Sequence, residues 1–150
     1  MGRAKLELPD KFDFCTEIDV RITDINYGGH LGNDSTLSLI HEARTRFLAK
    51  YGYREADIEG VGIIMIDAVI IYKGEVFYGD RLRVEVAVDD ISQTGCDFYY
   101  QLTKISTGKI VTQAKTSIVF FDYQAHKIAK TPKKFCEKIG NNPALDRRCS

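Results

Sequence analysis

One amphipathic helix, in a chain that otherwise alternates like β-strands, is the feature that most constrains the fold. Across residues 35–51 the apolar side chains return every three or four positions, at Leu37, Ile40, Ala43, Phe47 and Tyr51. This spacing predicts a helix of about four and a half turns. Gly52 stands where a helix C-terminus favours glycine, and Asn33 or Asp34 is expected to cap the N-terminus.

The rest of the chain has the patterns of strands and turns. Apolar and polar residues alternate, or Val and Ile accumulate, in segments that are separated by turn residues. The predicted strands are residues 12–22, 61–76, 82–88, 98–105 and 110–122, and a short helix is expected after Thr131. One long helix beside this much sheet predicts an α+β domain in which an antiparallel sheet wraps around a central helix.

Length and composition favour a single globular domain and argue against a nucleic-acid-binding or membrane-spanning protein. A chain of 150 residues is expected to form a single domain over residues 1–150, with its core at about 12–135. Its 21 basic and 21 acidic residues cancel, so there is no basic surface that would favour nucleic acid. No apolar run approaches the roughly 20 residues of a membrane helix. The first residues lack the apolar core of a secretory signal, which predicts a cytoplasmic location.

A polar, glycine-rich loop over residues 23–34 leads directly into the predicted helix. The first backbone N–H groups of a helix have no intrahelical partners and lie at its positive dipole end, which suits an oxyanion. Here that end is supplied with Asp24, Asn26, His30, Asn33 and Asp34. The arrangement indicates chemistry at a carbonyl group.

Several motifs follow one another in a recognisable order. They are Arg21, Asp24, Gly29-His30 and Asn33 in the loop, Glu42-Ala43-Arg44 in the helix, Tyr78-Gly79-Asp80 in a later turn, and Val119-Phe120-Phe121-Asp122 in the last strand. With these motifs, about residues 12 to 135 resemble a hotdog-fold acyl-CoA thioesterase of the 4-hydroxybenzoyl-CoA thioesterase type. The loop is also similar to the Asp/Asn/His loop of plant acyl-carrier-protein thioesterases.

The resemblance implies a fold, a substrate and an assembly. It implies a hotdog domain that forms a homodimer with a joined sheet, often within a tetramer. The active sites would lie at the dimer interface and take acyl thioesters of coenzyme A or acyl carrier protein. The resemblance implies no cofactor and no metal. The four cysteines lack the CxxC pairs and nearby histidines of a zinc site, which agrees with that expectation.

One position departs from the family pattern. Where these enzymes carry a catalytic Asp, two positions after the first acidic residue of the loop, this chain has Asn26. An amide cannot take a proton from water or act as a carboxylate nucleophile. Either another group supplies the base, or the protein binds a thioester without efficient hydrolysis.

Two side chains are candidates for the missing base. Glu42 lies about nine residues beyond the expected N-cap, roughly 13 Å along the helix, where several hotdog enzymes place a catalytic carboxylate. The alternative for Glu42 is an ion pair with Arg46 or Arg21. His30 is able to relay a proton or hydrogen-bond the thioester; its alternative is to brace the loop.

The other candidates concern binding and positioning. Asn26 either orients the attacking water or holds the turn. Asp34 either caps the helix or places a carboxylate near the carbonyl. Tyr27 and Gly29 would let the loop approach a ligand closely. The backbone N–H of Asn33 is the expected oxyanion donor.

The predicted function is therefore hydrolysis of an acyl-CoA or acyl-carrier-protein thioester to the free acid and thiol. Asn26, His30, Asp34 and Glu42 are the catalytic candidates, and Tyr27, Gly29 and Asn33 would bind the substrate. Two alternatives stay open: a hotdog protein that binds an acyl thioester without catalysis, and a hotdog dehydratase or hydratase. The helix motif that begins at Glu42 fits the dehydratase branch poorly.

Overall fold

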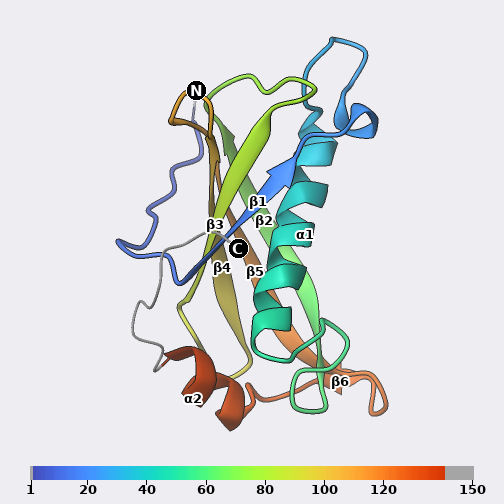
Figure 1. The fold of residues 1–150 in the computed structure, drawn as a ribbon. Helices are drawn as coiled ribbons and strands as arrows, with labels where there is room; N and C mark the ends of the chain where they lie inside the picture. Colours follow the sequence, from blue (N-terminus) through green and yellow to red (C-terminus); the bar gives the residue numbers. More distant parts are fainter. Residues whose placement is uncertain (1, 141–150) are drawn as a thin grey trace.

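The protein is a single antiparallel sheet with one long helix packed on it (Figure 1). The computed structural model describes residues 2–140. Within them the strands pair in the order β1–β3–β4–β5–β2, and a short β6 extends the sheet beside the end of β5. The strands are β1 (Phe14–Asp19), β2 (Gly62–Tyr72), β3 (Arg81–Asp89), β4 (Gly95–Lys104), β5 (Lys109–Asp122) and β6 (Lys127–Ile128).

Helix α1 (Asn33–Lys50) confirms the predicted central helix and begins two residues earlier than expected. Gly52, two residues beyond its end, has φ +78°, a conformation that favours glycine. A second helix, α2 (Lys133–Gly140), confirms the short helix expected near the end of the chain. Figure 1 shows α2 at the end of the sheet opposite to the loop that precedes α1.

The prediction that Asn33 or Asp34 caps α1 is wrong. The N-cap is Gly32, and no side chain makes a capping hydrogen bond there. The carbonyl of Gly32 accepts the first helical hydrogen bond, from the N–H of Thr36 at 3.0 Å. Asp34 lies inside the first turn, and its Oδ1 is only 2.6 Å from where a Cβ on Gly32 would stand. A residue with a side chain at position 32 would therefore displace the Asp34 carboxylate.

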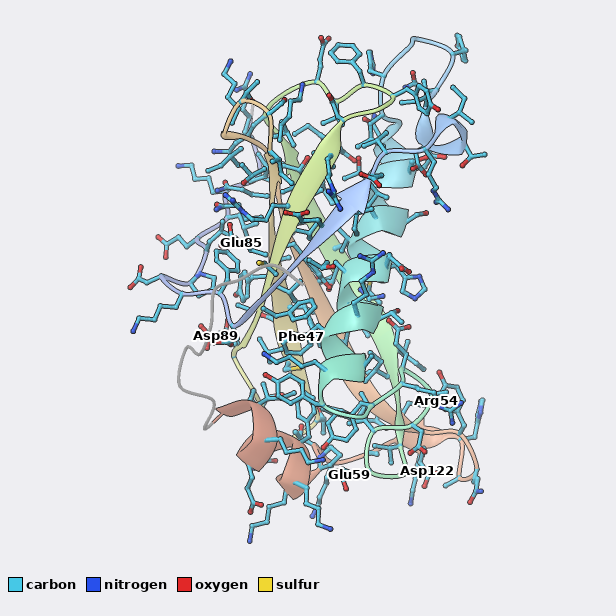
Figure 2. The ribbon with its side chains drawn as sticks, in the orientation of Figure 1. Phe47, Arg54, Glu59, Glu85, Asp89 and Asp122 are labelled. Carbon is cyan, nitrogen blue, oxygen red and sulfur yellow. The ribbon has the colours of Figure 1, made fainter. Side chains whose placement is uncertain are left out.

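Aromatic contacts fix α1 on the sheet. The Phe47 ring is fully buried and makes edge-to-face contacts with Phe14, at 5.8 Å between centroids, and with Phe98 at 5.6 Å. Figure 2 shows Phe47 between α1 and the strands. The other buried residues of the helix are Thr36, Leu39, Ile40, Ala43, Arg44 and Leu48. This packing confirms an α+β hotdog arrangement, with the sheet wrapped around the helix.

The first strand is shorter than the predicted 12–22, because the chain turns after Asp19. Residues Ile22–Asp24 form a 3-10 turn, η1. The Asp24 side chain, only 3% exposed for the residue, accepts from the Arg21 backbone N–H at 2.9 Å and pairs with the Arg21 guanidinium at 3.1 Å. These bonds end the strand and aim the following loop at the start of α1.

The outcomes for the other segments are mixed. The strands predicted at 61–76, 82–88, 98–105 and 110–122 correspond to β2, β3, β4 and β5, and β6 was not predicted. Across residues 2–140, no helix combines the length and the apolar character needed to cross a membrane.

Candidate active site at the start of α1

The loop ahead of α1 is a closed hydrogen-bonded turn. The N–H of Asn26 donates to the carbonyl of His30 at 3.0 Å, and the N–H of Gly29 donates back to the carbonyl of Asn26 at 3.0 Å. The N–H of Leu31 donates to the carbonyl of Val76 at 2.7 Å, which ties the loop to the segment after β2. Gly29 has φ +89°, so the turn itself favours glycine at this predicted binding position.

The amino end of α1 is left open by this arrangement. Because the N-cap is Gly32, no capping side chain occupies the N–H groups of the first turn. The first three of these groups belong to Asn33, Asp34 and Ser35, and the helix dipole adds partial positive charge beside them. Such a set of donors suits an oxygen that becomes negatively charged during a reaction.

Tyr72, at the end of β2, holds this first turn in place. Its hydroxyl donates to the carbonyl of Asn33 at 3.0 Å. Burial, and then the negative charge of Asp34, raise the pKa of the Tyr72 phenol, so the group stays protonated as a donor. The hydrogen bond thus holds the Asn33–Asp34 peptide, which follows the Asn33 N–H group expected to bind the oxyanion.

A cleft of about 170 Å³ opens beside the start of the helix. Its walls come from the loop, from α1, from the end of β2 and from β5. The lining residues are His30, Leu31, Asn33, Thr36, Tyr72, Gly74, Glu75, Val76 and Thr112. The structure therefore brings the predicted residues His30 and Asn33 together, and it adds Tyr72 and Glu75.

Asn26 and His30 approach each other over Gly28. A Cβ added to Gly28 would lie 3.1 Å from Oδ1 of Asn26 and 3.6 Å from Nε2 of His30. Oδ1 of Asn26 also accepts from the Gly28 N–H at 2.9 Å, so the amide does hold the turn. Its Nδ2 group can act only as a donor. Tyr27 is fully exposed at the tip of the loop.

Asp34 and Glu42 line hollows different from the cleft of His30. Asp34 belongs to a hollow of about 190 Å³ that also contains His41 of α1 and Met65 of β2. Glu42 lines a hollow of about 430 Å³ toward β1, and its carboxylate accepts from Nε of Arg46 at 3.1 Å. The ion pair considered for Glu42 from the sequence is thus present, and the structure does not bring Glu42 to His30.

No group of three or more His, Cys, Asp or Glu side chains within residues 2–140 is arranged to hold a metal ion. The open end of α1 offers hydrogen-bond donors, and the His30 imidazole lines the cleft beside them. Such a site can polarise a carbonyl and move a proton near it.

Comparison with solved structures defines the class of fold. A 1,4-dihydroxy-2-naphthoyl-CoA thioesterase from Synechocystis superposes with a TM-score of 0.78 at 21% identity, over 85% of this chain and 96% of its own. A DHNA-CoA thioesterase from Staphylococcus aureus superposes with a TM-score of 0.74 at 21% identity, over 83% of this chain and 85% of its own. The fold is that of hotdog thioesterases.

The sequence itself places the chain in a family. The family model of the Thioesterase-like superfamily matches residues 20–139, so the protein belongs to that superfamily. No curated protein sequence gives a significant match. The narrower likeness to the 4-hydroxybenzoyl-CoA thioesterase type stays a prediction.

Proposed function

We propose that this protein hydrolyses the thioester of an acyl-CoA, or of an acylated carrier protein, to the free acid and the thiol. The observation that carries the proposal is the uncapped amino end of α1, which opens into a cleft lined by His30 and Tyr72. Membership in the Thioesterase-like superfamily supports it. The two solved structures named above are CoA thioesterases by name, which favours coenzyme A as the thiol.

In the proposed reaction the thioester oxygen accepts hydrogen bonds from the N–H groups of the first helical turn, that of Asn33 among them. A water molecule positioned by Asn26 gives a proton to His30 and attacks the carbonyl carbon. The negative charge that develops on the oxygen is stabilised by the helix end. When the tetrahedral intermediate collapses, the carbon–sulfur bond breaks and the imidazolium returns the proton to the thiolate.

Proton transfer is assigned to His30 because it lines the same cleft as Asn33. Glu42 is paired with Arg46 on the β1 side of α1, which makes it the weaker candidate for the base. Asp34 lies in the first turn of α1, and we assign Tyr27 and Gly29, in the loop before the cleft, to contact with the entering substrate.

The direct test is hydrolysis of a panel of short, medium, long and aromatic acyl-CoA thioesters, followed by release of the free thiol. The proposal requires turnover of at least one member at a rate that depends on enzyme concentration. Absence of turnover across the panel, with both coenzyme A and carrier-protein thioesters, would refute it.

Asn26 favours a second candidate function, a protein that binds an acyl thioester without turning it over. We predict that Asn26→Asp raises kcat, by about tenfold or more, because it adds a carboxylate base beside His30. Thiol release by the two proteins would be compared at equal concentration. Measurable turnover by the native chain excludes the pure binding function, whereas micromolar binding without turnover supports it. Gln124→Glu, in the exposed turn after β5, is the control for exchanging an amide for a carboxylate away from the site.

We further propose that the protein forms a homodimer through β2. This strand is 11 residues long and ends the sheet, so one of its edges has no partner strand within residues 2–140. It exposes Met65 (42%), Ile66 (60%) and Tyr72 (47%). Long, apolar edge strands favour pairing with another chain. A joined sheet would also bring two candidate sites to one interface, and a tetramer could be built from such dimers.

Ile66→Lys is expected to raise the dimer dissociation constant by about two to four powers of ten, because a buried unpaired charge costs about 3–5 kcal/mol. Light scattering across a dilution series measures this change. Ile128→Lys is the matched control, since Ile128 is exposed to a similar degree (57%) on β6. If the dissociation constant rises equally in both variants, or does not rise in either, β2 is not the interface. The single-domain and cytoplasmic assignments remain proposals.

A further inference from the structure

A polar hollow lies between α1 and β2, directly below the open helix end. It has a volume of about 190 Å³ and is lined by Asp34, Leu37, Ser38, His41, Arg44 and Met65. Asp34 is the second residue of α1 and follows Asn33 directly, so the hollow starts at the first helical turn, next to the cleft of His30. Sites for drug-sized ligands usually have about 300–1,000 Å³. The polar hollow therefore fits one end of an acyl group.

A hydrogen-bonded network fixes His41 at the wall of this hollow. Oε2 of Glu55 lies 3.1 Å from Nε2 of His41, while Oε1 accepts from Nε of Arg44 at 2.7 Å. Arg44 is buried and donates through Nη1 to the hydroxyl of Tyr100 at 3.2 Å. Burial opposes the charge of Arg44, yet Tyr100 and Glu55 outweigh it and raise the pKa of the guanidinium. Glu55 is thus clamped by a permanent cation, and it orients the imidazole.

The network leaves the hollow rich in hydrogen-bond acceptors. In the neutral imidazole, Nε2 of His41 donates to Glu55 and Nδ1 is left as an acceptor. Asp34 lines the hollow, and its carboxylate can only accept hydrogen bonds while it is ionised. The charge of Arg44 is met by Glu55. A ligand group that hydrogen-bonds to Asp34 or to Nδ1 of His41 must therefore donate.

The length of the helix sets where that donor must lie. His41 follows Asp34 by seven residues, which is about 10 Å along α1 at a rise of 1.5 Å per residue. The imidazole is held there through Nε2 by Glu55, in the segment that follows α1. Ser38 follows Asp34 by four residues, about 6 Å, so a donor at roughly 6–10 Å from the thioester carbonyl would lie beside Ser38 and His41.

We propose that the polar hollow is an acyl-specificity site, in which His41 and Ser38 bind a hydrogen-bond donor at the far end of the acyl group. The donor is a hydroxyl or an ammonium group. This inference rests on the proposed function, since it assumes that the carbonyl docks at the amino end of α1. Glu55 acts as a positioning residue, because it contacts the substrate only through His41.

The test compares matched acyl-CoA thioesters that end in a methyl, a hydroxyl or an ammonium group, in chains of about four to ten carbons. We expect kcat/KM to be about tenfold or more higher for a donor-ended chain than for its methyl-ended match, at one optimal length. His41→Leu should abolish this preference by lowering kcat/KM for the donor-ended substrate alone. Ser38→Ala should reduce it.

The matched control introduces a leucine at another exposed position of α1. Ala49→Leu lies near the far end of α1 and should keep the full preference. Glu55→Gln should weaken the preference through KM with little change in kcat, whereas a purely structural role would lower the melting temperature with the preference intact. Equal gains from hydroxyl and ammonium would indicate recognition of the donor alone. A larger gain from ammonium would indicate that the charge of Asp34 is also recognised.

Calorimetry with non-hydrolysable coenzyme A thioethers carrying the same chains separates this inference from the proposed function. Donor-dependent binding without any thioester turnover would refute the hydrolase and keep the specificity site. Turnover in which methyl-ended chains are equal or better substrates would refute the specificity site and keep the hydrolase. A preference that survives in both His41→Leu and Ser38→Ala would also overturn it.

Discussion

His30→Ala is expected to lower kcat/KM for acyl-CoA hydrolysis by about 10²–10⁴-fold, the range found for loss of a general acid–base group. The expectation follows from its place in the cleft beside Asn33, where a proton must move when water attacks the carbonyl. Substrate binding should change less, because the N–H groups of the helix end stay in place. Steady-state kinetics with the best substrate of the panel measures both parameters.

The comparison variants for His30 are chosen to separate chemistry from folding. His126→Asn replaces a histidine at the exposed turn before β6, where φ is +54° and asparagine is tolerated, so activity should be unchanged. Melting curves should show His30→Ala folded. If His30→Ala loses less than about threefold while Glu42→Gln loses at least a hundredfold, the base is Glu42 instead.

Much of the fold could be predicted because local patterns and long-range packing agree. The 3.6-residue period that locates α1 also sets the face on which Ile40 and Phe47 are buried. The alternation predicted for residues 82–88 is likewise visible in β3, where Leu82, Val84 and Val86 are buried. The cap of α1 could not be predicted from side-chain preference, because the decisive bond joins the N–H of Gly32 to the carbonyl of Asp24 at 3.0 Å. That contact depends on how the whole loop closes.

The candidate site was only partly accessible from the sequence. The loop motif located His30 and Asn33, since these residues are neighbours along the chain. Tyr72 was missed because its contact with Asn33 joins residues 39 positions apart. Nothing in the pattern of β2 signals which of its residues meets the start of α1.

His41 and Glu42 show why the sequence alone could not assign neighbouring helix residues to one site or another. Successive residues of a helix point about 100° apart, so these two neighbours face different surroundings. His41 lines the hollow beside β2, and Glu42 lines the one beside β1. Whether a helix residue faces β1 or β2 depends on the order of the strands in the sheet, and that order comes from long-range pairing.

Phe47→Ala is expected to destabilise the fold by about 3–5 kcal/mol, the range for removing a buried aromatic side chain. The ring is fully buried and contacts Phe14 and Phe98, and it also packs on Tyr51 at 5.2 Å between centroids. The cavity would open between α1 and the sheet, the interface that holds the helix in place. Urea unfolding, followed by circular dichroism, measures the free energy of unfolding.

Phe77→Ala is the matched control, because Phe77 is 44% exposed and its ring contact is with Lys104 at 5.3 Å. Its expected cost is below about 1.5 kcal/mol. Equal costs for the two variants would show that α1 is not anchored by the Phe47 cluster. Phe47→Ala should also reduce catalytic activity, because a helix that shifts on the sheet also shifts the N–H groups at its amino end. Phe47→Ala should therefore lower kcat even at temperatures where the variant is fully folded.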